Sequence, residues 1–200
     1  TSSGRPTGAI KGVSNMMMNL KNENDGSSII TVFDAKGKTF RHEIYSEYKA
    51  NRNSMPSELS EQTGAIIELV KAYGIKVIQE SGVEADDVIA SVAKQIKIEK
   101  SQIIISSGDK DLAQLVCSDV VLMNNFDSKI LDQDGVIDKF GVKPNQIFDY
   151  LCLVGDTSDN IPGVPKVGPK TAVNWLSKYG TVETIIENAE EITGKVGEYL

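Results

Sequence analysis

Short apolar segments alternate with segments of helical periodicity along much of this 200-residue chain. A chain that alternates in this way favours a parallel sheet with helices packed against it. The expected strands are 29–33, 75–79, 103–105 and 120–123, and the expected helices are 10–20, 62–73, 85–96 and 111–116. The sequence therefore predicts an α/β fold with a mostly parallel sheet.

Acidic residues follow three of these strands. Because ligands bind beyond the carboxyl ends of parallel strands, we expect the acids to gather at one edge of the sheet. Each acid alone is open to another interpretation; Ser81 and Glu84, for example, fit a helix capping box. Three successive strand ends that carry acids favour a divalent-metal site. The acids are Asp34, Glu84, Asp86, Asp87, Asp109 and Asp111.

The composition restricts which metal such a site would hold. The chain has a single histidine, His42, and its two cysteines, Cys117 and Cys152, lack metal-ligand spacing. We interpret these cysteines as reduced thiols within the core. Oxygen ligands remain, and they select magnesium, manganese or calcium.

The formal net charge of −7 does not by itself exclude a nucleic-acid partner. Eight of the 28 acidic residues belong to the acidic cluster once Asp156 and Asp159 are included, which leaves 20 against 21 Lys and Arg. The rest of the chain is thus close to neutral. There is no apolar run of membrane-spanning length and no secretory leader, so we expect a cytoplasmic protein without a membrane partner.

Residues 35–60 show neither the helical nor the strand period. Basic and aromatic side chains alternate there, a composition typical of single-strand binding. A solvated loop whose tyrosines fold back on the body is an equally good interpretation. The residues concerned are Lys36, Lys38, Phe40, Arg41, Tyr45, Tyr48, Lys49 and Arg52.

Beyond residue 131 the pattern changes to short helices, expected at 132–140 and 144–154, followed by a hairpin at 155–172. Gly168 allows a tight turn, and Pro169 suits the first position of a helix. Backbone N–H groups at such a helix start bind phosphate, and three lysines add positive charge. This is a helix-hairpin-helix pattern, although a plain helical hairpin is the alternative. The lysines are Lys166, Lys170 and Lys178.

Five motifs stand in order across almost the whole chain, at 32–41, 48–56, 82–87, 107–111 and 155–163. Together they closely resemble the 5′→3′ exonuclease domain of bacterial DNA polymerase I, a member of the flap endonuclease family. The resemblance implies a PIN-like core with a helical arch at about 35–60. It also implies a two-domain organisation, with a metal-binding nuclease core at 1–130 and a helix-hairpin-helix subdomain at 131–200.

The resemblance further implies a magnesium-dependent 5′ nuclease that removes flaps and RNA primers in DNA replication and repair. Two Mg²⁺ ions about 4 Å apart would serve phosphodiester hydrolysis, and Mn²⁺ would substitute for Mg²⁺. One ion would be held by Asp34, Glu84 and Asp86. The second would be held by Asp109, Asp111 and Asp159, with Asp86 near both ions and with Asp87 and Asp156 completing the acidic ring.

By the same resemblance, Lys49 and Arg52 would be the catalytic cations at the scissile phosphate, supported by Arg41 and Tyr48. The hairpin would bind duplex DNA and a K⁺ ion. Its DNA-binding residues would be Gly163, Lys166, Gly168, Lys170 and Thr171. The implied partners are DNA with a 5′ flap or 5′ end, RNA primer–DNA junctions, and a fused or neighbouring polymerase domain. We expect a monomer in the bacterial cytoplasm, associated with the nucleoid.

The chain departs from the family pattern in two places. The family begins with a strand that ends in a further metal-binding aspartate, and this sequence starts after that strand. Lys166 stands where many relatives have a glycine. Two alternatives follow: a catalytically impaired DNA-binding module, and a Toprim-like metal nuclease that uses Asp109 and Asp111. The arch and the hairpin argue against the second.

Overall fold

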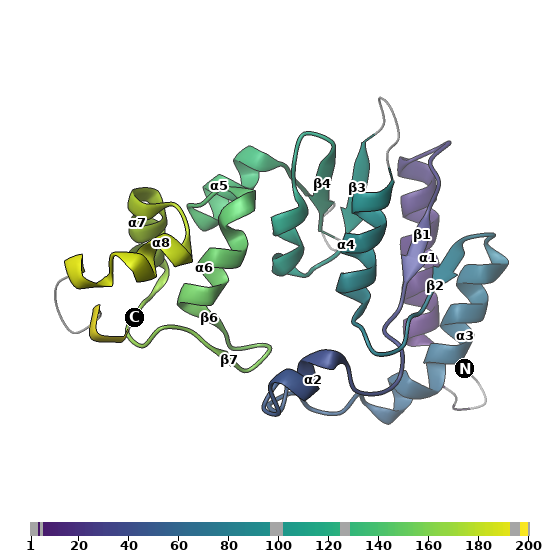
Figure 1. The fold of residues 1–200 in the computed structure, drawn as a ribbon. Coiled ribbons are helices and arrows are strands. Elements are labelled where there is room, and N and C mark those ends of the chain that lie inside the picture. Colours follow the sequence, from purple (N-terminus) through teal and green to yellow (C-terminus); the bar gives the residue numbers. More distant parts are fainter. Residues whose placement is uncertain (1–3, 5, 97–101, 125–128, 193–196, 200) are drawn as a thin grey trace. The chain divides into compact units, whose positions relative to one another are not determined.

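The computed structural model describes residues 4, 6–96, 102–124, 129–192 and 197–199 (Figure 1). The chain divides into two compact units, each described by itself below. Unit 1 comprises Thr1–Ile44 and Arg52–Val88, and unit 2 comprises Tyr45–Asn51 and Ile89–Leu200. The short segment 45–51 therefore belongs to the same unit as the C-terminal helices, although both of its flanks belong to unit 1.

Unit 1 contains a two-stranded parallel sheet. Val32 of one strand pairs with Ile78 of the other. The strands expected at 29–33 and 75–79 are thus confirmed. The elements of this unit are α1 (Gly8–Glu23), β1 (Ile30–Val32), α2 (Phe40–Ile44), α3 (Ser57–Ala72), β2 (Lys76–Ile78) and the first turn of α4 (Ala85–Gln95).

Helix α3 begins at Ser57, five residues before the expected start. Its first turn is exposed and, apart from Leu59, polar, so hydrophobic periodicity could not reveal it. The helix starts directly after Pro56, whose extended backbone (φ −53°, ψ 138°) precedes the first helical residue.

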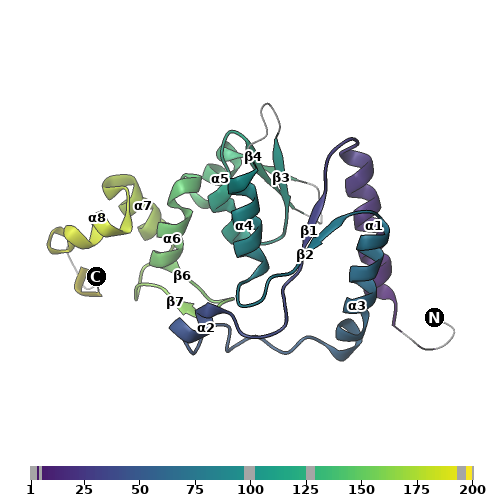
Figure 2. The ribbon, with the colours of Figure 1, turned by 45° about the vertical axis from the view of Figure 1, so that its right-hand side comes forward.

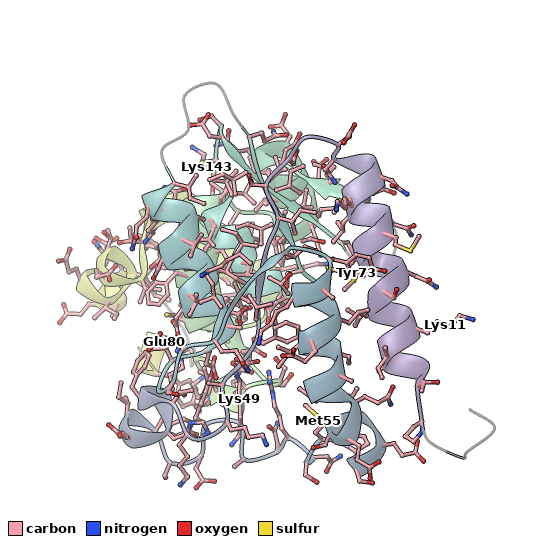
Figure 3. The ribbon with its side chains drawn as sticks, turned by 90° about the vertical axis from the view of Figure 1, so that its right-hand side faces the viewer. Lys11, Lys49, Met55, Tyr73, Glu80 and Lys143 are labelled. Carbon is pink, nitrogen blue, oxygen red and sulfur yellow. The ribbon has the colours of Figure 1, made fainter. Side chains whose placement is uncertain are left out.

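Helices α1 and α3 pack side by side (Figures 1 and 2). The buried side chain of Gln62 on α3 accepts hydrogen bonds at Oε1 from the backbone N–H groups of Ala9 (3.0 Å) and Ile10 (3.3 Å). The side chain of Thr7 does not cap the start of α1. Gln62 of the neighbouring helix therefore accepts the hydrogen bonds of N–H groups that a capping side chain would otherwise bind. At the other end, the Tyr73 hydroxyl lies 2.9 Å from Ser14 Oγ, whereas Lys11 points away from α3 (Figure 3).

The core of unit 1 consists of Met17, Val70 and Ile75. Of the three consecutive methionines, Met17 is buried, Met16 packs against this cluster, and Met18 is half exposed. Two of the three consecutive methionines therefore contribute to this core, and Met18 faces away from it.

Unit 2 has its own sheet, in which a parallel pair of strands is joined by an antiparallel one. Among the described residues the strands thus form separate small sheets rather than the one larger sheet expected from their spacing. The helix expected at 111–116 is a 3₁₀ helix. The elements are β3 (Ile103–Ser106), η1 (Lys110–Leu115), β4 (Val120–Met123) and β5 (Ile130–Leu131).

The remaining elements of unit 2 are mostly short helices (Figure 2). Asp132 Oδ1 accepts a hydrogen bond from Gly135 N (2.9 Å) at the start of α5, and Gly141 ends that helix in the left-handed conformation. The elements are α5 (Gln133–Phe140), η2 (Pro144–Gln146), α6 (Ile147–Val154), β6 (Gly155–Asp156), β7 (Ile161–Pro162), α7 (Pro169–Tyr179), α8 (Val182–Glu187), η3 (Ala189–Glu191) and η4 (Gly197–Tyr199). The helices expected at 132–140 and 144–154 are confirmed.

One core of unit 2 extends from the sheet to these helices. Leu112 and Val120 share it with Leu153, Leu176 and Ile185. It holds the acidic loop after β3 and the hairpin after α6 on one packed body.

Cys117 and Cys152 are free thiols but are exposed, so their expected place in the core is wrong. Cys117 follows the buried Val116, where the chain leaves the core, and Cys152 lies on the outer face of α6 beside the buried Leu153. None of the described helices is both long enough and apolar enough to cross a membrane.

Candidate functional site

The acidic residues of unit 1 lie where β1 ends and where α4 begins. Asp34 follows β1, and its exposed carboxylate accepts a hydrogen bond at Oδ1 from Ala85 N (2.8 Å). Asp87 Oδ2 accepts another from Glu84 N (2.9 Å). Two acids therefore cap donors at the first turn of α4, where negative charge is favourable. Asp86 lies half-buried in that same turn.

Arg41 supplies the positive charge for this group. Its guanidinium forms a bidentate pair with Asp87, with Nη1–Oδ2 at 2.6 Å and Nη2–Oδ1 at 2.7 Å, and lies 4.0 Å from the buried Glu84. The same guanidinium stacks 4.7 Å from the ring centre of Phe40. Bidentate pairing orients Arg41 at the root of the segment expected to be the arch.

The second acidic group lies in unit 2, where the loop after β3 meets the hairpin after α6. Asp109 Oδ1 accepts a hydrogen bond from Asp111 N (2.9 Å) at the start of η1. Asp156 is buried, and its Oδ1 accepts bonds from Ser158 N (2.8 Å) and Ser158 Oγ (2.6 Å). Its other oxygen, Oδ2, lies 3.1 Å from Lys110 Nζ.

Lys110 is a site residue that the sequence reading did not single out. Its only sequence signal is its place between Asp109 and Asp111, which gives it carboxylates on both sides. Burial would raise the pKa of Asp156, but hydrogen bonds from Ser158 and Lys110 hold that pKa below its ordinary value. Burial would lower the pKa of Lys110, and its bond to Asp156 raises it instead.

The carboxylate of Asp111 lies among other acids. Its Oδ1 is buried and has no hydrogen-bond partner among the described residues. Burial raises the pKa of Asp111 to about 6, and the charges of Asp109 and Asp156 add to this effect. An orphaned carboxylate oxygen beside other carboxylates fits a hard cation such as Mg²⁺ or Mn²⁺, which takes oxygen ligands.

Several of the acids form ion pairs with lysine or arginine side chains. No group of three or more His, Cys, Asp or Glu side chains that could hold a metal ion is present within the part of the chain that the structure describes. Asp87, Asp156 and Asp159 are instead paired with Arg41, Lys110 and Lys49.

Residues 45–51 fold back onto the hairpin loop of the same unit. The Tyr48 hydroxyl donates to Asp159 Oδ2 (2.9 Å), Lys49 Nζ lies 3.7 Å from that oxygen, and Lys49 N donates to Asp159 O (2.9 Å). Only 4% of Tyr48 is exposed. The alternative in which tyrosines fold back on the body is therefore correct for Tyr48. Its hydroxyl group binds the carboxylate of Asp159. Arg52, which begins the next part of unit 1, is exposed.

The expected tight turn of the hairpin falls on Lys166, with φ +66°, and not on Gly168, whose backbone is extended (φ −105°, ψ 177°). Val167 N donates to Val164 O (3.0 Å) across Pro165 and Lys166. Proline followed by a residue of positive φ is typical of a type II turn, which usually has glycine in the second place. Lys166 therefore adopts a conformation that glycine takes more readily.

Gly163 is required by packing. A Cβ added there would lie 2.3 Å from Val154 C and 2.4 Å from Gly155 N. Gly163 thus lets the hairpin pass close to the end of α6. The exposed Lys170 and the half-buried Thr171 lie in the first turn of α7, which begins with Pro169 as expected.

The sequence matches two family models end to end. Residues 1–141 match the 5′-3′ exonuclease N-terminal resolvase-like domain, and residues 142–200 match the 5′-3′ exonuclease C-terminal SAM fold. Among curated proteins, DNA polymerase I of Pseudomonas aeruginosa is 49% identical over 180 residues, which is 90% of this chain and 20% of that protein. The 5′-3′ exonuclease of Aquifex aeolicus is 44% identical over 191 residues, 96% of this chain and 66% of that protein.

Solved structures show the same fold. The T5 D15 protein co-crystallised with metal ions superposes with a TM-score of 0.83 at 27% identity, covering 97% of this chain and 77% of that one. The catalytic core of Rad2 in complex with DNA superposes with a TM-score of 0.59 at 20% identity, covering 94% and 62%, and supports the fold alone. The chain thus spans a fifth of the polymerase and about two thirds of the exonuclease it matches, and it belongs to the 5′-3′ exonuclease family.

Proposed function

We propose that this chain hydrolyses phosphodiester bonds of DNA as a metal-dependent 5′→3′ exonuclease and flap endonuclease. The observation that carries the proposal is the orphaned, buried Oδ1 of Asp111 among the carboxylates of unit 2. Membership of the 5′-3′ exonuclease family supports the reaction. The T5 D15 relatives, one solved with metal ions and one as a flap endonuclease pseudo-enzyme-product complex with DNA and metal ions, support the cofactor and the substrate.

The carboxylates of each unit would hold one ion. Asp34, Glu84 and Asp86 would serve the first, and Asp109, Asp111 and Asp159 the second. Asp87 and Asp156 support these groups by orienting Arg41 and Lys110. Bound Mg²⁺, or Mn²⁺ in its place, would lower the pKa of a water molecule and stabilise charge on the phosphate.

The cations of residues 41–52 would hold the reacting phosphate. Lys49 is half-buried and fixed beside Asp159, whereas Arg52 is exposed. When a phosphate enters, its charge competes with Asp159 for the Lys49 ammonium. Preorganised cations of this kind stabilise the negative charge that develops in the transition state.

The hairpin would hold the DNA backbone without reading bases. Helix α7 has no side-chain cap at its start, so the N–H groups of its first turn, beside Lys170 and Thr171, lack a capping side chain, and Lys166 extends from the turn before it. Gly163 lets the hairpin backbone pass close to the end of α6. Gly168 has no side chain, which leaves the backbone at the start of α7 open to a phosphate. A K⁺ ion would be held by backbone carbonyls of the same hairpin.

In the cell the substrates would be DNA with a 5′ flap or 5′ end and RNA primer–DNA junctions of replication and repair. The similarity to DNA polymerase I supports a fused or neighbouring polymerase domain. We place the chain in the bacterial cytoplasm, at the nucleoid, as a monomer.

The test is cleavage of a 5′-end-labelled flap substrate by the full chain with Mg²⁺, with Mn²⁺ and with EDTA. The double variant Asp109→Asn, Asp111→Asn should abolish metal-dependent cleavage and keep duplex binding, because these side chains are assigned to the metal. Asp138→Asn, on the exposed face of α5, is the matched control and should cleave normally. Normal cleavage by the double variant would refute the metal assignment. Binding without cleavage by the wild-type chain would identify a DNA-binding module instead.

A further inference from the structure

A groove of about 310 Å³ lies within unit 2, between residues 45–51 and the hairpin loop. Its volume is at the small end of ligand sites, which suits a single base or nucleoside. We call it the Tyr45 groove. It is lined by Tyr45, Asn51, Thr157, Asn160, Ile161 and Pro162.

Hydrogen bonds across the groove hold its walls in place. Asn51 Nδ2 donates to Thr157 O (2.7 Å), and Asn160 Nδ2 donates to Glu47 O (2.7 Å). Asn160 has a φ of +58°, a left-handed conformation that asparagine tolerates better than most residues. The two amide side chains therefore fasten residues 45–51 to the hairpin loop from opposite sides.

The lining has the chemistry of a base site. The six lining residues carry no charge, so the groove suits the neutral base of a nucleotide and not its phosphate. Tyr45 is 37% exposed and Ile161 40% exposed, which provides an aromatic surface and an apolar wall. Such surfaces stack on bases with little sequence preference.

The amide groups add hydrogen-bond acceptors. Each donates through Nδ2 to a backbone carbonyl, and no hydrogen bond to the Oδ1 atoms of Asn51 and Asn160 is found in the described ranges. These oxygens can accept from the N–H groups that bases carry on their pairing edges. Each of the four DNA bases carries at least one N–H group on its pairing edge. In an unpaired base this group is available to donate a hydrogen bond.

We propose that the Tyr45 groove binds one unpaired nucleobase of the 5′ single-stranded arm, with the base stacked on Tyr45 and hydrogen-bonded to Asn51 and Asn160. This rests on the proposed function, which supplies the substrate, and it assigns a position within that substrate.

The groove is tested by fluorescence of 2-aminopurine placed at successive positions of the 5′ arm of a flapped DNA, with EDTA present so that the DNA stays intact. The full chain should quench the base at one position, because stacking on an aromatic ring quenches this fluorophore. Tyr45→Leu should lose that quenching and bind the DNA about tenfold more weakly. Tyr45→Phe keeps the ring and should retain both.

Phe148→Leu is the matched control, because Phe148 is an aromatic residue of the same unit, 61% exposed on α6 and outside the groove. It should bind and quench like the wild type. Equal quenching by wild type and Tyr45→Leu, or quenching at no position, would overturn the base site. Cleavage of the same flap in Mg²⁺ is measured separately: cleavage without position-specific quenching refutes only the groove, and quenching without cleavage refutes only the nuclease.

Discussion

The ammonium group of Lys110 lies 3.1 Å from Oδ2 of Asp156, a carboxylate that is 5% exposed. Asp109 and Asp111 flank this lysine in sequence, and both contribute to the rise of its pKa. Lys110 thus provides a positive charge within the same acidic group to which we assign a metal ion. The Lys110 ammonium group and a divalent cation would therefore compete for electrostatic attraction to the same carboxylates.

Lys110→Gln should therefore bind Mn²⁺ about fivefold more tightly, because a pair of this exposure contributes about 1 kcal/mol. The metal-free variant should also melt at a lower temperature, since Asp156 loses its partner. Titration calorimetry and thermal unfolding in EDTA measure the two effects. Lys143→Gln removes the same charge from an exposed position and should change neither. Weaker Mn²⁺ binding by Lys110→Gln would show that the lysine assists the metal.

Asp111 should make metal-free stability depend on pH. Its pKa is about 6 in the fold against 3.8 for the free side chain, so the folded state binds more protons between these values. The free energy of unfolding should then fall as pH rises from about 4 through 6 and stay lowered above it. Asp111→Asn removes this dependence and should unfold at a higher temperature at pH 7. Urea unfolding in EDTA at several pH values measures it, and identical pH profiles for variant and wild type would contradict the assignment.

Two glycines of the hairpin should respond in opposite ways to the same substitution. Gly163→Ala should destabilise the fold by at least about 3 kcal/mol, because its Cβ would overlap the backbone of Val154 and Gly155. Gly168→Ala should change stability by less than about 0.5 kcal/mol, since its backbone is extended and, apart from its chain neighbours, no atom of the described residues lies within 4 Å of the added Cβ. Urea denaturation compares them, and equal losses would refute the packing role of Gly163.

Substitutions of Lys166 and Lys170 distinguish the effect of backbone strain from the effect of phosphate binding. Lys166→Gly should raise stability by about 0.5–1 kcal/mol, because it relieves a positive φ, while it weakens duplex binding. Lys170→Ala should weaken duplex binding at every sequence and reduce the slope of log K against log salt by about one. Thermal unfolding and anisotropy titrations at several salt concentrations measure these effects. A loss confined to certain DNA sequences would indicate base readout and would exclude the phosphate contact.

The sequence by itself determined the elements and the candidate residues. Strands 29–33 and 75–79, the helix at 132–140 and the start of α7 at Pro169 are confirmed, because apolar periodicity and helix caps depend on neighbours in the chain. The motifs also indicated the family that the comparisons confirm. The sequence does not reveal the early start of α3, because its first turn is exposed and, with the single exception of Leu59, polar, which leaves no periodic signal.

Only the tertiary structure decided which charges and surfaces meet. Lys110 pairs with Asp156 and Tyr48 with Asp159 although each pair is distant in sequence, because packing brings their loops together. The exposure of Cys117 and Cys152 and the burial of Asp111 Oδ1 likewise depend on neighbours from other segments. Local sequence sets the conformations that a segment favours, whereas burial and long-range ion pairs are properties of the folded chain.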